Sequence, residues 1–358
     1  MPFDRLIPYN ELPLLPPAAE LETKAVLKQA ISANRMLANL RGLAAQIPNQ
    51  GVLINSIVLQ EARLSSEIEN IVTTNDELYR AAADADGKTD PHTKEVLRYR
   101  QALNHGFREI GARPLSTNLF IEIVRIIKEV DFGVRRVPGT ALKNAQGDVI
   151  YTPPVGEAII RDKLANLEQF MHADDDLDPL VKMAVMHYQF EAIHPFEDGN
   201  GRTGRILNLL YLVERGLLDI PVLFLSRYII ANKAGYYEGL RGVTERQEWE
   251  PWVLFMLQAV ESTAQQTFDQ VTRIRVLMEQ VREQVQQQAP GIYSKDLIEV
   301  IFQHPYTKIQ FLVDSSIAKR QTASSYLQTL AGLGILRPSK QGREMYYIND
   351  ALFAELVK

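Results

Sequence analysis

The sequence His194-Pro195-Phe196-Glu197-Asp198-Gly199-Asn200-Gly201-Arg202-Thr203-Gly204-Arg205 lies between two strongly apolar stretches. Before it, apolar residues recur at helical spacing over about 179–193, and one face carries Leu180, Val181, Ala184, Val185 and Tyr188. After it, the pattern continues with Ile206, Leu209, Leu210 and Val213 until Gly216. The spacing predicts two apolar helices joined by a polar loop, and the glycine is expected to end the second helix.

The loop combines groups that can hold a phosphate. Gly199 and Gly201 have no Cβ, so backbone N–H groups can converge on an anion there. The loop then enters a helix N-terminus, where unpaired N–H groups and the helix dipole favour negative charge. Arg202 and Arg205 are three residues apart and share a helix face, from which both can bind phosphate oxygens. We therefore interpret residues 199–205 as a phosphate-binding site.

Two further residues give the loop its chemistry. Asp198 suits Mg²⁺, because a carboxylate is a hard oxygen ligand. His194 is suited to accept a proton near neutral pH, since an unperturbed histidine has a pKa of about 6.5. Each feature alone has an ordinary explanation: a Gly-Asn-Gly turn, a capping histidine, a pair of solvated arginines. Their coincidence in one short loop favours attack on a nucleotide phosphate.

The whole segment also resembles a known motif. Residues 194–205 fill every defined position of H-x-F-x-[D/E]-G-N-G-R-x-x-R, the motif of the Fic family. The resemblance implies a helical fold with one β-hairpin, the flap, and transfer of AMP from Mg·ATP to a Ser, Thr or Tyr hydroxyl of a target protein. It further implies that His194 is the base, that Asp198 holds Mg²⁺ and that Phe196 packs the loop. The ATP-binding residues would be Gly199, Asn200, Gly201, Arg202, Thr203, Gly204 and Arg205.

A hairpin is expected within residues 139–154. Gly147-Asp148 lies between the apolar pair Ala141-Leu142 and the run Val149-Ile150-Tyr151, as in two strands joined by a turn. By resemblance this hairpin is the flap, which clamps a segment of the target protein by backbone pairing. The alternative is an ordinary surface hairpin.

Residues 228–237 resemble the family segment that receives the adenine. On this reading Asn232 hydrogen-bonds the base, and Tyr236 and Tyr237 pack near it. The alternative is that the two tyrosines belong to the hydrophobic core, where aromatic pairs on a helix are usually found.

An inhibitory segment is expected upstream. Residues 65–70, Ser-Ser-Glu-Ile-Glu-Asn, match [S/T]-x-x-x-E-[G/N], the inhibitory motif of one class of Fic proteins, and lie in a helix expected over about 55–71. The resemblance implies that Glu69 pairs with Arg205 and takes the place and charge of the ATP γ-phosphate, with Ser65 as the other end of the motif. The alternatives are an exposed i, i+4 face, or a Glu69 that positions a water for removing AMP.

The chain divides into three predicted parts. We expect a helical N-terminal region with the inhibitory helix over 1–93, a Fic catalytic core over 94–290 and a C-terminal domain over 291–358. The last boundary follows a Gln- and Glu-rich helix that stops at Pro290-Gly291. The C-terminal part combines three short helices with a hairpin around Gln341-Gly342, which is the winged-helix pattern. The expected fold is therefore mainly α, with a β-hairpin flap and a winged helix.

The charge of the C-terminal part bears on DNA binding. Residues 293–358 contain eight Lys and Arg against six Asp and Glu. The presumed recognition helix offers Lys319 and Arg320 and then neutral side chains, and Lys340 and Arg343 lie on the wing. Specific DNA binding normally rests on more phosphate contacts than these. DNA stays open as a partner, but interaction with protein is favoured.

Bulk composition sets the remaining limits. Hydrophobic residues make up 46%, charged residues 23% and the net charge is −5, which is ordinary for a soluble globular protein. The absence of cysteine excludes disulfides and thiolate metal sites. The N-terminus lacks the basic start and apolar run of a secretory signal, and no segment is apolar enough to span a bilayer. We expect a cytoplasmic protein with no membrane partner.

These observations predict a protein adenylyltransferase that uses ATP and Mg²⁺, modifies a target protein and itself, and is self-inhibited through Glu69. A homo-oligomer is expected. Two other functions stay open: a hydrolase that removes AMP, or another phosphate-group transferase, on the same scaffold; and a nucleotide-sensing, DNA-binding regulator. An unaltered His194 argues against the regulator, because a sensor has no need of a base.

Overall fold

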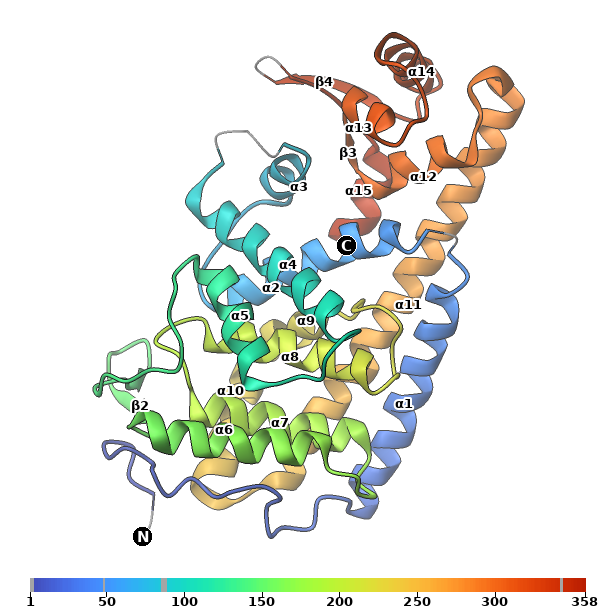
Figure 1. The fold of residues 1–358 in the computed structure, drawn as a ribbon. Helices are drawn as coiled ribbons and strands as arrows, with labels where there is room; N and C mark the ends of the chain where they lie inside the picture. Colours follow the sequence, from blue (N-terminus) through green and yellow to red (C-terminus); the bar gives the residue numbers. More distant parts are fainter. Residues whose placement is uncertain (1–2, 48, 85–88, 342–343) are drawn as a thin grey trace.

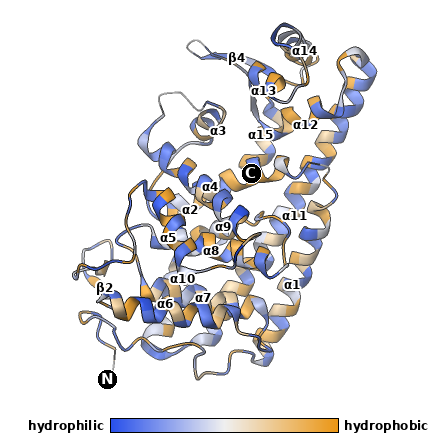
Figure 2. Ribbon diagram, in the orientation of Figure 1, coloured by the Kyte–Doolittle hydropathy of each residue, from blue (hydrophilic) through white to orange (hydrophobic). Residues whose placement is uncertain are grey.

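The computed structural model describes residues 3–47, 49–84, 89–341 and 344–358. Two long helices, α1 (Lys24–Ala44) and α11 (Trp249–Gln288), pack side by side along one edge of the molecule (Figure 1). Figure 2 shows apolar and polar residues alternating along α11, as expected of a helix with one buried side. Among the described helices, none combines the length and apolar character needed to cross a membrane.

The two helices that flank the polar loop form the centre of the molecule. They are α7 (Pro179–Ile193) and α8 (Asn200–Glu214), and nearly every residue of both is buried. They pack against α1, α11, α2 (Gly51–Ile68), α4 (Pro91–Glu109), α5 (Thr117–Lys128) and α6 (Glu157–His172). Two further helices, α9 (Leu225–Ala231) and α10 (Lys233–Arg246), pack against α11. The prediction of a helix over 179–193 is confirmed. Its apolar residues cover all sides rather than one face, because neighbouring helices enclose it.

The hairpin predicted within 139–154 is present. Strands β1 (Leu142–Lys143) and β2 (Val149–Tyr151) pair antiparallel, with Leu142 opposite Tyr151. The side chain of Asn144 closes the turn, because its Oδ1 accepts from the backbone N–H groups of Gln146 and Asp148. Gly147 in this turn has φ of +88°, a left-handed conformation that glycine adopts without strain.

The C-terminal part has the expected helices and hairpin. Its elements are η1 (Pro290–Ile292), α12 (Lys295–Gln303), β3 (Tyr306–Thr307), α13 (Ile309–Asp314), α14 (Arg320–Gly332), β4 (Arg337–Gln341), β5 (Glu344–Ile348) and α15 (Asp350–Val357). The sheet order is β3-β5-β4 and both pairings are antiparallel. The predicted turn at Gly342 lies outside the described residues, as does Arg343. The mainly α fold with a winged-helix arrangement is thereby confirmed.

Besides the three-residue helix η1, two elements of the C-terminal part were not predicted. Strand β3 is only two residues long, too short for a pattern of alternation. Helix α15 is capped by Asn349, whose Oδ1 accepts from the Leu352 N–H group, and it buries Leu352 and Leu356. It packs against α2 and α11, so the end of the chain contacts the helix that carries the inhibitory motif.

The C-terminal part also contacts α3 (Asn75–Ala83) and the residue that follows it. Lys308 pairs with Asp84 at 3.2 Å, and the Tyr346 hydroxyl donates to the same carboxylate. Arg80 donates to Gln341 Oε1 at 2.8 Å. These contacts and the packing of α15 join the N-terminal and C-terminal parts of the chain. The domain boundaries at residues 93/94 and 290/291 therefore stay predictions.

Candidate functional site

The polar loop begins with a change of backbone direction at His194. Helix α7 ends at Ile193, and His194 follows it in the left-handed conformation, with φ 49° and ψ 59°. Asn200 closes the loop, because its Oδ1 accepts from the Phe196 N–H group and its Nδ2 donates to the Phe196 carbonyl, both at 2.8 Å. Phe196 is fully buried and contacts Phe190. The side chain of Asn200 therefore holds the loop closed. Its backbone N–H group takes no part in these two hydrogen bonds and can bind a ligand.

The N-terminus of α8 forms the nest expected from the glycines. Gly199 is the residue before the helix and has φ of +85°. The N–H groups of residues 200–202 belong to the first turn, which has no intrahelical acceptors for them. A Cβ on Gly201 would lie 2.3 Å from Glu69 Oε1, so only glycine accommodates the carboxylate at this place. The nest thus faces the acidic side chain of Glu69.

Thr203 and Gly204 lie on a different side of α8. Both are buried, and a Cβ on Gly204 would lie 2.5 Å from Glu191 Oε1 on α7. Within the described part of the chain, the Thr203 hydroxyl has no hydrogen-bond partner. Gly204 therefore packs against α7, and Thr203, two residues after Gly201, lies on the side of α8 opposite the one that faces Glu69.

Glu69 pairs with Arg205, as the family resemblance implied, and Ser65 contacts the same arginine. Arg205 Nη2 lies 2.8 Å from Glu69 Oε1, and its Nε donates to the Ser65 hydroxyl at the same distance. Arg205 Nη2 also donates to the Ser65 carbonyl. Burial alone would raise the pKa of Glu69, but the Arg205 charge and hydrogen bond outweigh it and hold the pKa below its usual value. Glu69 is therefore ionised at neutral pH.

Arg202 and Asp198 belong to a second charged cluster. Arg202 Nη1 lies 2.7 Å from Glu95 Oε1, and Lys128 Nζ lies 2.9 Å from the same oxygen. Lys128 also pairs with Asp198 at 2.6 Å. Neither Glu95 on α4 nor Lys128 on α5 was predicted, since each is distant in sequence and belongs to no motif. Arg202 and Asp198 each already have an oppositely charged partner in this state of the protein.

Asp198 can serve as a ligand for Mg²⁺ only together with a bound nucleotide. No group of three or more His, Cys, Asp or Glu side chains that could enclose a metal exists among the described residues. Mg²⁺ typically binds through one or two carboxylates together with nucleotide phosphates and waters. The Asp198 side chain is 62% exposed and adjoins the nest, so a single carboxylate beside a bound phosphate fits this ion.

His194 is neutral at physiological pH. Burial and the nearby Arg135 guanidinium lower its pKa to about 4, and the carboxylates of Glu69 and Asp198 oppose this shift. Its Nδ1 is buried and has no hydrogen-bond partner within the described ranges. A neutral imidazole can accept a proton, which is the role that the loop pattern predicted.

The three predicted adenine contacts have different surroundings. Asn232 is exposed and its Nδ2 donates to the Tyr228 carbonyl at 2.9 Å. Tyr236 is buried, and its hydroxyl lies 2.8 Å from His187 Nε2. Tyr237 is 44% exposed. Tyr236 therefore has the surroundings of a core residue, while Asn232 and Tyr237 are open to a ligand.

Lys233 was missed by the sequence analysis and connects this segment to the inhibitory helix. Its Nζ donates to the Ile68 carbonyl at 2.9 Å, next to Glu69. The segment 232–237 therefore adjoins the end of α2. No motif includes this lysine, so only the fold brings it to the site.

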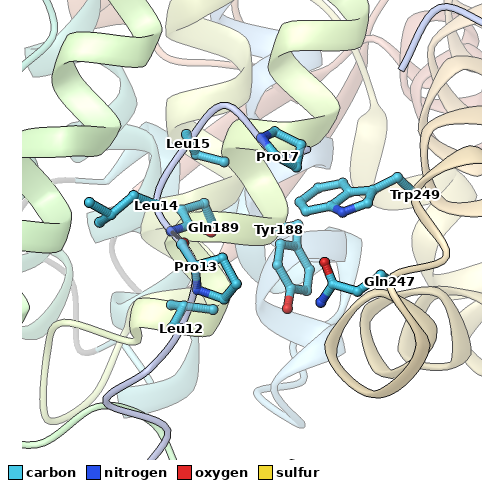
Figure 3. A pocket seen from close by; sticks show the side chains of 9 residues that line it. All are labelled: Leu12, Pro13, Leu14, Leu15, Pro17, Tyr188, Gln189, Gln247 and Trp249. Carbon is cyan, nitrogen blue, oxygen red and sulfur yellow. Dashed lines mark hydrogen bonds between the residues drawn. The ribbon is translucent and has the colours of Figure 1, made fainter. Parts of the chain in front are cut away.

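The hollow in Figure 3 is separate from this loop. It is lined by Leu12, Pro13, Leu14, Leu15, Pro17, Tyr188, Gln189, Gln247 and Trp249, where the N-terminal segment crosses α7 and the start of α11. No residue of the loop 194–205 lines it, and none of its lining residues is charged. It therefore offers no groups for the chemistry considered above.

Glu61 leads to a prediction about pH. Its carboxylate is buried on α2 and accepts from the Ser226 N–H and hydroxyl groups. Burial nevertheless raises its pKa from 4.5 to about 7. The folded state then holds the proton more tightly than the unfolded state, so this contribution to stability is complete below pH 4.5 and is lost as the pH rises through 7.

In the native protein, this shift lowers the free energy of unfolding by about 3 kcal/mol as the pH rises from acid to neutral. We expect Glu61→Gln to lack this pH-dependent loss of stability. Urea unfolding at pH 5 and pH 8 would measure it. Glu67→Gln is the control, because Glu67 is on the same helix but is partly exposed and pairs with Arg63. An equal pH dependence in native protein and Glu61→Gln would contradict the prediction.

Three sequence families match this chain. Residues 27–108 match the family described as Fic/DOC family N-terminal, and residues 114–212 match the Fic/DOC family itself. Residues 277–352 match the C-terminal domain described as protein adenylyltransferase SoFic-like. The matches follow one another along the chain and together take in the inhibitory segment, the polar loop and most of the C-terminal part.

Curated relatives match over shorter segments. A probable protein adenylyltransferase of Aquifex aeolicus is 36% identical over 23% of this chain and 25% of its own length. The protein adenylyltransferase fic-1 of Caenorhabditis elegans is 29% identical over 37% of this chain and 26% of its own. Protein adenylyltransferase Fic of Culex quinquefasciatus is 28% identical over 50% of this chain. The aligned segments thus span a quarter to a third of those relatives.

Solved structures share the fold. A Fic family protein from Desulfovibrio desulfuricans G20 superposes with a TM-score of 0.56 at 19% identity, covering 91% of this chain and 96% of that one. Fic-1 of C. elegans, residues 134–508, has a TM-score of 0.52 at 20% identity and covers 68% of this chain and 73% of that one. The likeness extends over most of the helical architecture.

Proposed function

Since the chain belongs to the Fic family, we propose from that premise that it transfers AMP from ATP to a hydroxyl of a target protein, and also to itself. The observation that carries this proposal is the position of His194 directly before the anion nest at the N-terminus of α8. Two buried arginines, Arg202 and Arg205, complete the nest. A base, a phosphate site and positive charge in one loop suit attack on a nucleotide phosphate.

The reaction follows from the positions of these groups. The neutral imidazole of His194 accepts the proton of the target Ser, Thr or Tyr hydroxyl. The hydroxyl oxygen then forms a bond to the α-phosphorus, and the bond from that phosphorus to the oxygen bridging to the β-phosphate breaks, releasing pyrophosphate. The N–H groups of residues 200–202 and the two arginines bind the phosphate oxygens. When bound through Asp198, Mg²⁺ supplies further positive charge to these phosphates.

We propose that Glu69 holds this activity in check. Its carboxylate lies against Gly201 and pairs with Arg205, so it occupies the volume and the cation that the γ-phosphate needs. ATP could then bind only with its α-phosphate badly placed for in-line attack. The helix that carries Glu69 contacts α12 and α15, so binding events at the C-terminal part could bias this pair.

The target protein is proposed to bind along the hairpin 139–154 in an extended conformation. Strand β2 pairs with β1 on one edge, and a segment added by backbone pairing would lie next to the catalytic loop. We further propose that the protein acts in the cytoplasm as a homo-oligomer. The C-terminal part is proposed to bind protein rather than DNA, because the exposed face of α14 carries Arg320 followed by neutral side chains.

Labelled ATP tests this function. We expect the Glu69→Gly variant, incubated with Mg²⁺ and ATP labelled at the α-phosphate, to label itself and proteins of a cell lysate, and γ-labelled ATP to leave no label. Label from the γ-phosphate would instead indicate phosphate transfer. No label from either, in a variant shown to bind ATP, would contradict AMP transfer by this chain.

Removal of AMP is the second candidate. The Glu69 carboxylate is close enough to His194 to influence its pKa, so this acid could position a water near the nest. Native protein incubated with AMP-modified protein from the first experiment would release AMP if this reaction occurs. The Glu69→Gly variant would then release less.

A further inference from the structure

Arg135 lies between the hairpin and the catalytic loop, outside every motif considered above. We propose that Arg135 is a positioning residue that holds His194 in its left-handed conformation and couples it to the hairpin. The proposal rests on the proposed function, in which His194 is the base. It assigns no contact between Arg135 and ATP.

The contacts of Arg135 all lead to the end of α7 or of the hairpin. Its Nε donates to the His194 carbonyl at 2.8 Å, and its Nη2 donates to the Ile193 carbonyl at 3.4 Å. The same Nη2 donates to the Pro154 carbonyl, and the Arg135 backbone N–H group donates to the Pro195 carbonyl. The carbonyls of Ile193 and His194 are among those that the C-terminus of α7 leaves without intrahelical partners.

The burial of this cation is unusual. Arg135 is 3% exposed, and no carboxylate pairs with it in the described part of the chain. Taking a guanidinium out of water is costly unless its donors are satisfied. Here backbone carbonyls, at the negative end of the helix dipole, take the place of a counter-ion. A surface arginine or a simple packing residue would not need this arrangement.

His194 needs such support because of its backbone. With φ of 49° it is one of the few non-glycine residues with positive φ, a conformation that costs about 1–2 kcal/mol for an ordinary residue. A residue stays in this region only where its surroundings hold it there. Nε and Nη2 of the Arg135 guanidinium, here called the Arg135 fork, bind the carbonyls of His194 and Ile193 at the same time. These two hydrogen bonds fix the backbone of His194 and with it the orientation of the imidazole.

The same side chain reaches the hairpin. Pro154 lies three residues after the end of β2, so Arg135 joins the segment that leaves this strand to the base. A second bond supports the coupling: the Tyr151 hydroxyl, from β2 itself, donates to the Ala192 carbonyl at 2.8 Å. A target segment paired along the hairpin would therefore present its hydroxyl at a fixed place relative to His194.

The charge of Arg135 affects the pKa of His194, which a residue that only packs would not change. The charged groups that influence His194 are Arg135, Glu69 and Asp198, and Glu191 lies one turn earlier on α7. Two causes lower the His194 pKa: burial, which is the larger, and the Arg135 guanidinium. Removing this cation raises that pKa, so the acid limb of the pH–rate profile moves to higher pH.

The experiment compares three substitutions in the Glu69→Gly background. Arg135→Gln removes charge and fork, Arg135→Lys keeps the charge and loses the fork, and Arg136→Gln is the matched control. Arg136 is the next residue, is 76% exposed and pairs with Glu157 at the surface. We expect kcat to fall about 100-fold in Arg135→Gln and about 10-fold in Arg135→Lys, because small misplacements of catalytic groups have effects of this size. The control keeps the parent rate.

Two further measurements separate positioning from folding. ATP binding by calorimetry should be unchanged in both Arg135 variants, and an NMR titration of the His194 ring should show a raised pKa in Arg135→Gln but not in Arg135→Lys. A fall in kcat that accompanies an equal loss of ATP binding would overturn the proposal, as would a His194 titration that Arg135→Gln leaves unmoved. If Arg135→Gln fails to fold, Arg135→Lys tests the proposal: a lower kcat with unchanged ATP binding supports it, and an unchanged kcat contradicts it. If the parent transfers no AMP, the titration still tests Arg135 independently of the proposed function.

Discussion

Replacing Glu69 by glycine is expected to raise the rate of AMP transfer by about 100-fold or more. Two unit charges about 4 Å apart interact by about 4 kcal/mol at the effective dielectric constant of a protein surface. Glu69 is 38% exposed, so solvent screens part of this repulsion towards a γ-phosphate. Each 1.36 kcal/mol or so that remains corresponds to a tenfold change in rate. Removing the carboxylate also frees Arg205, which then binds phosphate instead.

The measurement is the initial rate of label transfer from α-labelled ATP, with ATP affinity determined separately. Glu67→Gly is the matched control, since it makes the same substitution two residues earlier on α2, at a side chain that pairs with Arg63 on the surface. We expect Glu67→Gly to keep the native rate. An equal rise in both variants would mean that weakening the helix end, and not removal of the Glu69 charge, causes the effect.

The polar loop and the inhibitory segment were predictable because each has its functional residues close together in the sequence. Residues 194–205 carry base, nest and arginines in one continuous segment, and Ser65 and Glu69 are one helical turn apart. Spacing along a helix then suffices to place side chains on one face. The pairing of Glu69 with Arg205 needed one long-range contact, and only the family resemblance supplied it.

The rest of the site could not be predicted for the opposite reason. Glu95 is 107 residues from Arg202, and Arg135 is 59 residues from His194. Each is a single charged residue in a segment with many others, so no period or motif distinguishes it. The fold selects them by packing α4 and α5 against α8 and the hairpin against the end of α7. Apolar periodicity predicted the limits of α7, whereas α2 begins at Gly51 and ends at Ile68 instead of spanning about 55–71, and β3 was too short for any pattern.

Replacing His194 by alanine in the Glu69→Gly background is expected to lower the rate of AMP transfer by about 1,000-fold. General base catalysis contributes factors of about 100 to 10,000. ATP affinity should change little, because the phosphates are held by the N-terminus of α8 and the two arginines. His92→Ala is the control, since His92 is exposed near the start of α4.

The pH profile connects this loss to the proton. The His194 pKa is about 4 in the native protein, and it is lower in Glu69→Gly because the Glu69 carboxylate no longer raises it. In Glu69→Gly the rate should therefore fall only as the pH decreases to this low range, because a protonated imidazole cannot accept the hydroxyl proton. In the double variant the small remaining rate should lack this acid limb. A double variant that keeps both the rate and the acid limb would remove His194 from the reaction and assign the proton to another group. Loss of the rate together with the limb would place the proton transfer at the imidazole itself.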